Sequence, residues 1–165
     1  MLASLDIQNV VLIDRLSLEG DAGLVALTGE TGAGKSILLD ALGLALGARA
    51  DAGLVRHGAA QATVTASFEL PALHPLRDFL AEHGIDGAEH IILRRSVAKD
   101  GRSKAFINDA AVSVQFLRDV GAQLIEIHGQ FDTHGLLDSA THVDTLDAFA
   151  ESLADAKAVA AAWAG

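Results

Sequence analysis

Residues 29–36, which read GETGAGKS, are the segment whose residue types and spacing point most directly to chemistry. They match the pattern G-x-x-x-x-G-K-[ST] in full. Gly29, Gly32 and Gly34 permit positive φ angles and close approach of the backbone. Successive N–H groups can therefore surround phosphate oxygens, and the segment predicts a phosphate-binding loop.

Lys35 and Ser36 provide the side-chain chemistry that such a loop needs. The Lys35 ammonium is expected between the β- and γ-phosphates of a nucleotide, and the Ser36 hydroxyl is expected to ligate Mg²⁺. A helix that follows the loop would point its N-terminal partial positive charge at the same anion. The residues predicted here to bind the nucleotide are Gly29, Glu30, Thr31, Gly32, Ala33, Gly34, Lys35, Ser36 and Ile37.

The segments around the loop predict a strand before it and a helix after it. Residues 24–28 form a compact apolar run, which favours a buried strand. Residues 37–46 contain Asp40 as their only charged residue, so that helix should be buried on several sides. Gly47 is a natural C-terminal cap for it.

The remaining pattern predicts further strands and two more helices. Residues 61–70 alternate between apolar and polar side chains, which favours an antiparallel strand. Asp100-Gly101 predicts a hairpin turn, and Ser113 a helix cap. Strands are expected at 2–7, around Leu16 and Leu18, at 91–95, 104–107 and 124–127, and helices at 76–83 and 114–120.

Composition narrows the class of protein. The 165 residues suffice for one buried domain, and 50% hydrophobic with 21% charged residues predicts a folded chain. There is no cysteine, and no apolar run long enough for a membrane span or a secretory signal, so we expect a cytoplasmic protein. The net charge of −10 argues against a dedicated basic DNA-binding module but permits a local basic patch.

The C-terminal residues have a different pattern. Apolar residues recur at alternating spacings of three and four, which is the heptad pattern of a coiled coil. An amphipathic helix that packs on its own domain fits these few repeats equally well. We expect residues 1–139 to form one domain and residues 140–165 to begin a coiled-coil helix that continues in a longer protein. The seam consists of Leu146, Phe149, Leu153, Ala156, Ala160 and Trp163.

Several segments together resemble a known family. Residues 5–10 and 24–42 resemble the head of SMC-type ATPases. Residues 47–51, 54–58, 100–108 and 125–130 extend this resemblance, in order, to the RecN family of bacterial DNA repair proteins. The resemblance covers about residues 1–150. It implies an α/β P-loop NTPase fold, the N-terminal half of an ABC/SMC-type ATPase head with a mixed β-sheet, and a cytoplasmic, nucleoid-associated protein.

The resemblance also implies roles for two further residues. Gln130 matches the Q-loop glutamine, which helps to hold Mg²⁺ and senses the γ-phosphate, so it joins Lys35 as an expected catalytic residue. Arg56 matches an arginine that SMC-like heads place near the nucleotide or DNA, although a surface arginine is an equally good interpretation.

The family's Walker B and signature motifs do not occur in this sequence, so the chain alone should hydrolyse ATP negligibly. In the family these motifs belong to the C-terminal half of the same protein, which is therefore an expected partner. A second head and DNA are the others, and the implied work is recombinational repair of double-strand breaks, with ATP binding closing two heads and hydrolysis reopening them. A self-contained P-loop kinase or GTPase and a non-catalytic assembly module remain as alternatives.

Two other groups of residues contain side chains that could bind a metal ion or DNA. His128, Asp132 and His134 lack the spacing of a metal site and are more simply surface or structural residues. The 94–104 segment is the most basic part of the chain and could touch DNA, but a solvated hairpin is the favoured interpretation. Its cations are Arg94, Arg95, Lys99, Arg102 and Lys104.

Overall fold

The computed structural model describes residues 1–20, 23–28, 33–87, 89–125, 127, 142–150 and 152–164. The chain divides into two compact units, Met1–Ile125 and Glu126–Gly165. Among the described residues, no helix is both long enough and apolar enough to cross a membrane.

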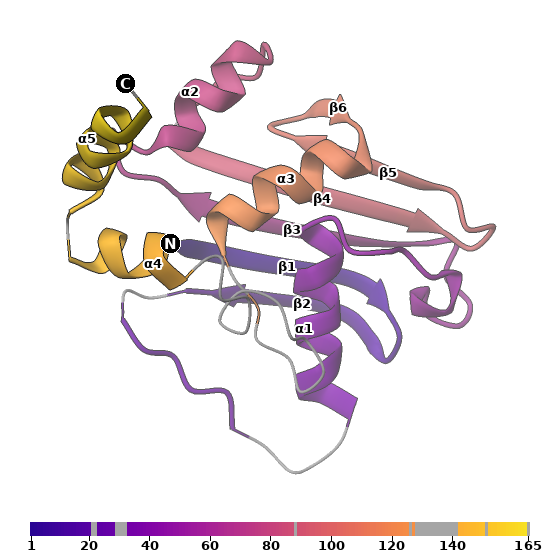
Figure 1. The fold of residues 1–165 in the computed structure, drawn as a ribbon. Helices are drawn as coiled ribbons and strands as arrows, with labels where there is room; N and C mark the ends of the chain where they lie inside the picture. The colour runs from indigo at the N-terminus through magenta and orange to yellow at the C-terminus, as the bar shows by residue number, and fades with distance from the viewer. Residues whose placement is uncertain are drawn as a thin grey trace. The chain divides into compact units, whose positions relative to one another are not determined.

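A six-stranded sheet with the order β2-β1-β3-β4-β5-β6 forms the frame of the first unit (Figure 1). All five pairs of neighbouring strands in it are antiparallel. The described residues therefore contain no parallel pair of the predicted mixed sheet. The strands are β1 (Leu2–Val10), β2 (Ile13–Glu19), β3 (Gln61–Glu69), β4 (His90–Ala98), β5 (Ser103–Ile107) and β6 (Ala110–Val112).

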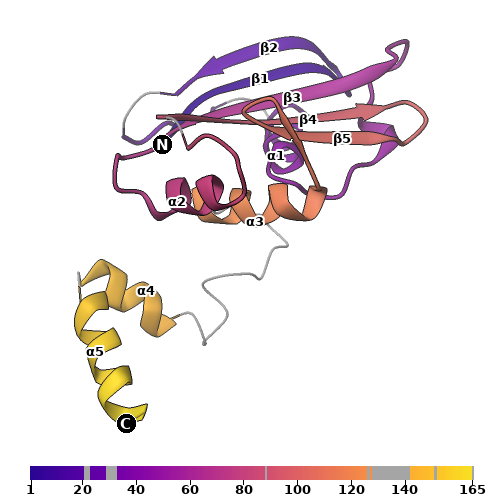
Figure 2. The same ribbon diagram turned by 90° about the horizontal axis from the view of Figure 1, so that it is seen from above.

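Three helices cover one face of this sheet (Figure 2). They are α1 (Ala33–Ala45), α2 (Pro75–Glu82) and α3 (Val114–Leu124), and a short 3-10 turn, η1 (Ala52–Leu54), follows α1. The predicted caps are present, because Ser113 Oγ accepts a hydrogen bond from the Phe116 N–H at 3.1 Å and Gly47 has a φ of 92°. Helix α3 begins directly after Ser113, and α1 ends shortly before Gly47, as these local signals predict.

The core lies between the sheet and the helices because each strand alternates its side chains. Leu5, Ala66, Leu93 and Ile107 are paired in register across β1, β3, β4 and β5, and all four are buried. The buried side chains of α1 are Ile37, Ala41, Leu42, Leu44 and Ala45. Every second side chain of the strands therefore packs against the apolar side of α1.

The other face of the sheet is polar. Asp6, Thr65, Arg94 and Phe106 form a register row on it, and none of them is fully buried. None of the three helices of the first unit lies on this face (Figure 2). The unit is thus a two-layer structure with one apolar interface.

Two expected strands are not formed by the described residues. Residues 24–28 pair with no described strand, and Leu24, Val25 and Leu27 are exposed. The predicted strand at 124–127 is also wrong at its start, since α3 continues to Leu124, and Ile125 and Ile127 belong to no strand. The strands that did form pair antiparallel with one another, whereas these two apolar segments find no partner within the described chain.

The second unit contains α4 (His142–Phe149) and α5 (Leu153–Ala164). Helix α4 ends at Phe149 and α5 begins at Leu153. Between them the Ser152 N–H and Oγ both donate hydrogen bonds to the Asp147 carbonyl oxygen. The predicted heptad seam therefore runs over two helices in place of one. Its participation in a coiled coil stays a prediction, as does the domain boundary near residue 140.

The contact between α1 and α3 depends on glycines. A Cβ at Gly47 would lie 2.7 Å from the Arg118 backbone nitrogen, and one at Gly121 would lie 2.8 Å from the Leu46 carbonyl oxygen. The two backbones can approach this closely only because neither glycine has a side chain. The C-terminal end of α1 is consequently held directly against α3.

Substitution of Gly47 tests this contact, with Gly58 as the matched control. Both glycines have positive φ, but nothing lies within 4 Å of a Cβ at Gly58. Gly58→Ala should lower the free energy of unfolding by about 1–2 kcal/mol through backbone strain alone. Gly47→Ala should lose a further 1–3 kcal/mol, approximately, through overpacking against α3. Urea unfolding measures both values, and equal losses would contradict the close contact.

Candidate nucleotide-binding site

The first turn of α1 lies inside the predicted phosphate-binding segment, because α1 begins at Ala33. The first N–H groups of a helix have no acceptor within the helix and carry partial positive charge. Gly34 and Ser36 are exposed, and a Cβ at Gly34 would meet nothing within 4 Å. This turn therefore offers N–H groups, a hydroxyl and open space to an anion, a combination that fits a phosphate.

Lys35 and Ile37 are the next residues of the predicted set. Lys35 is half-buried, whereas the Ile37 side chain is buried in the core. Ile37 thus anchors the start of α1 through its side chain, and a contact of Ile37 with a nucleotide stays a prediction that concerns its backbone. Gly29, Glu30, Thr31, Gly32 and Gln130 lie outside the described residues, as do His128, Asp132 and His134.

Arg56 is held at one end of the sheet. Its N–H donates to the Asn9 carbonyl oxygen at 2.9 Å, and its Nη1 lies 3.2 Å from Asp14 Oδ1 on β2. The described hydrogen bonds of Arg56 are with Asn9, Asp14 and Ala59, and none of these residues belongs to the first turn of α1. A role for Arg56 at the nucleotide stays a prediction, and the ion pair with Asp14 was not foreseen, because it links residues far apart in the sequence.

The predicted basic segment does not form one patch. Arg94 and Arg95 are neighbours on β4 and so point to opposite faces of the sheet. Arg94 pairs with Asp109 at 2.9 Å and lies 4.6 Å from the centre of the Phe106 ring. Arg102 pairs with Asp100 across the turn, and its hydrogen bond lowers the pKa of the Asp100 carboxyl.

Arg95 is buried on the helix-covered face and is only 2% exposed. Its Nη2 donates to Ser103 Oγ at 3.0 Å, while Nε and Nη1 have no acceptor among the described residues. Burial, together with the positive charge of Arg118, lowers the pKa of Arg95. Arg95 has the same parity as Ile91, Leu93 and Val97, whose side chains are buried. A predicted strand that continued past residue 95 would therefore have indicated that Arg95 points toward the core.

Replacement of Arg95 tests its unpaired donors. Exchange of a buried charged group for an apolar one of similar volume is often neutral or stabilising by about 1–4 kcal/mol. Arg95→Met should therefore keep or raise the free energy of unfolding, measured in urea. Ser103→Ala is the control, and it should be destabilising because it leaves a third donor of Arg95 unsatisfied. A large loss in Arg95→Met would mean that Nε and Nη1 do have acceptors.

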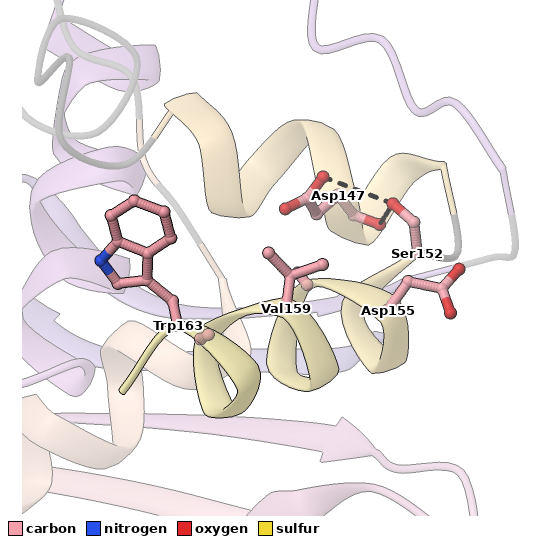
Figure 3. A pocket seen from close by; sticks show the side chains of 7 residues that line it. Asp147, Ser152, Asp155, Val159 and Trp163 are labelled. Carbon is pink, nitrogen blue, oxygen red and sulfur yellow. Dashed lines mark hydrogen bonds between the residues drawn. The ribbon is translucent and has the colours of Figure 1, made fainter. Parts of the chain in front are cut away.

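The second unit has a hollow between α4 and α5, of about 580 Å³ (Figure 3). Asp147, Ser152 and Asp155 lie at one end of it, the exposed Trp163 lies at the other, and Val159 lies between them. Its wall is mainly apolar, and the Ser152 hydroxyl in it donates hydrogen bonds to the carbonyl and carboxylate oxygens of Asp147, each at 3.3 Å. No cluster of acidic residues and histidines that could hold a metal ion occurs in the part of the chain that the structure describes.

Comparison with known proteins identifies the class. Residues 4–132 match the model of the AAA domain family, and the chain belongs to this family. Together with the segment at 29–36, this makes the first unit a P-loop ATPase-type domain that binds nucleotide.

The particular similarity is to bacterial DNA repair proteins named RecN. The chain is 42% identical to RecN of Bacillus subtilis over 151 residues, which cover 91% of this chain and 26% of that protein. It is 40% identical to RecN of Xylella fastidiosa over 166 residues, which cover 99% of this chain and 30% of that protein. The chain is thus a homologue of the N-terminal region of RecN and spans under a third of the length of these relatives, so the predicted resemblance is confirmed.

Solved structures support the same fold. A structure from work on ATP-driven dimerization and DNA-stimulated activation of SMC ATPases matches with a TM-score of 0.62 and 22% identity, covering 88% of this chain and 98% of that one. The Smc head domain with an extended coiled coil derived from Pyrococcus furiosus, bound to the C-terminal domain of ScpA, matches with a TM-score of 0.59 and 21% identity. This match covers 74% of the present chain and 32% of that one. The predicted SMC head-like fold is confirmed.

Proposed function

We propose that this chain is the ATP-binding part of an SMC-like ATPase head that acts in recombinational repair of DNA double-strand breaks. The observation that carries the proposal is the first turn of α1. It begins within the motif 29–36, and its exposed residues Gly34 and Ser36 bring backbone N–H groups and a hydroxyl to the surface. ATP binding would close two heads, and hydrolysis would reopen them.

The residues of the motif have distinct roles in this proposal. Backbone groups of Gly29 to Ala33 surround the phosphates, and Lys35 neutralises charge on the β- and γ-phosphates. Ser36 and Gln130 hold Mg²⁺, which neutralises developing charge when bound. Ile37 fixes the helix below them, since its side chain is buried.

The first partner in this proposal is the C-terminal part of a longer protein, which carries the Walker B and signature motifs. Its support is an uncovered apolar surface on the first unit. A groove of about 380 Å³ runs between residues 23–27, the ends of β1 and β2, and α1. Leu24, Val25 and Leu27 beside it are exposed, as is Leu39 on the outer side of α1. Contiguous exposed apolar surface of this kind marks an interaction site.

The partner would also satisfy the backbone of residues 24–28. These residues lack a ladder partner among the described strands, although their composition favours a buried strand. A strand from the C-terminal part would provide those hydrogen bonds. A second head and DNA complete the proposed assembly, in the cytoplasm at the nucleoid.

Removal of the Lys35 ammonium tests the ATP site in the full-length protein. Lys35→Ala should lower the rate of ATP hydrolysis by about 100-fold or more, as expected when a positioned charge-stabilising group is lost. Lys157→Ala, on α5, is the matched control and should hydrolyse ATP at the unaltered rate. A Lys35→Ala protein that retained normal turnover would contradict the assignment of the site.

Completion of the site by the C-terminal part can be tested directly. ATP-Mg²⁺ is added to the 165-residue chain alone, to the C-terminal part alone, and to their mixture. Phosphate release is expected from the mixture only, because positioning and charge stabilisation make up nearly all of phosphoryl-transfer catalysis. Hydrolysis or phosphate transfer by the chain alone would favour a self-contained kinase or GTPase.

A further inference from the structure

Positive charge is concentrated in three loops of this acidic chain. Residues 9–15, 48–60 and 98–104 together contain six of the 12 lysine and arginine residues but three of the 22 acidic ones. The remainder of the chain is strongly acidic in consequence. We call the six cations the basic rim: Arg15, Arg49, Arg56, Lys99, Arg102 and Lys104.

The fold brings these loops together at one end of the sheet. β1 and β4 end there, and β2, β3 and β5 begin there, at the right of Figure 1. Backbone hydrogen bonds join the loops directly: the Val11 N–H donates to the Leu54 carbonyl oxygen at 2.9 Å, and the Lys99 N–H to the Ala60 carbonyl oxygen at 3.0 Å. The basic rim is therefore one surface, although its residues are far apart in the sequence.

The side chains of the basic rim are available to a partner. Arg15, Arg49, Lys99 and Lys104 are exposed and have no ion pair among the described residues. Arg56 and Arg102 pair with Asp14 and Asp100, but both pairs are in contact with solvent. Exposed ion pairs contribute little stability, so an anionic partner can compete for these two arginines.

The length of the basic rim suits a nucleic-acid backbone. From Arg15 on β2 to Lys104 on β5 there are four strand spacings, or about 19 Å. Duplex DNA presents about 11 backbone charges over that distance. A protein partner would need apolar anchors, and Leu12 is the only large apolar side chain of these three described loops that is exposed.

We propose that the basic rim binds the phosphate backbone of duplex DNA without sequence preference. The inference rests on the proposed role in DNA repair and assigns to that role a surface separate from the ATP site. The first turn of α1 carries Lys35, whereas Arg49 of the basic rim follows the opposite end of this helix, about 20 Å away along its axis. Arg56, for which a role at the nucleotide stays a prediction, is left unaltered in the test. DNA and nucleotide would thus occupy different surfaces of the same unit.

The test uses the full-length protein and a duplex of random sequence, with binding measured over a range of salt concentrations. Lys99→Gln/Lys104→Gln removes two unpaired cations and should raise the dissociation constant about tenfold and lower the salt slope by about two. Arg15→Gln/Arg49→Gln should have the same effect from the other side of the rim. Ala72→Glu/Ala81→Glu is the control, because it changes net charge equally at exposed positions near α2.

The control should bind DNA with unaltered affinity and slope, and all variants should keep the melting temperature of the unaltered protein. Unchanged DNA binding by both rim variants, or an equal loss in the control, would overturn the basic rim as the binding surface. If that happened while ATP hydrolysis still depended on Lys35, the proposed function would stand without it. Failure of the unaltered protein to bind DNA at all would overturn both.

Discussion

The packing of α1 against the helix-covered face of the sheet is the contact on which the other features of the first unit depend. Ile37, Ala41 and Leu44 bury one side of the helix against the apolar rows of β1, β3 and β4. Because α1 begins inside the phosphate-binding segment, this burial determines where the first-turn N–H groups point. The Gly47 and Gly121 contacts hold its other end against α3. The candidate site is therefore a consequence of core packing at both ends of one helix.

Among the described residues, the same helix is covered on one side only. Its outer side carries the exposed Leu39, and the adjacent residues 24–28 expose Leu24, Val25 and Leu27. This exposed apolar surface beside the first turn of α1 supports the proposal that another part of a longer protein completes the domain. The relatives, of which this chain covers 26–30%, have the length to provide it.

The basic residues of the first unit occupy very different environments. Arg94 and Arg95, adjacent in sequence, have opposite environments: one pairs with Asp109 beside solvent, and the other lies in the core with two unsatisfied donors. The unpaired exposed cations collect where the loops of β1, β3 and β4 meet. The chain thus has one basic surface although its net charge is −10.

The sequence by itself determined the features that depend on neighbours along the chain. The motif at 29–36, the caps at Ser113 and Gly47, the hairpin turn at Asp100-Gly101 and the alternation of β3 all follow from local backbone preference and side-chain period. These signals were enough for the P-loop, for most strands and, through the resemblance, for the family.

Only the tertiary structure decided which distant residues meet. The pairing of Arg56 with Asp14, the burial of Arg95, the short strand β6 and the assembly of the basic rim depend on sheet order and register. The expected strand at 24–28 did not form for the same reason, since an apolar segment becomes a strand only when another strand accepts its hydrogen bonds. Local preference can nominate a strand, but its pairing partner decides whether it forms.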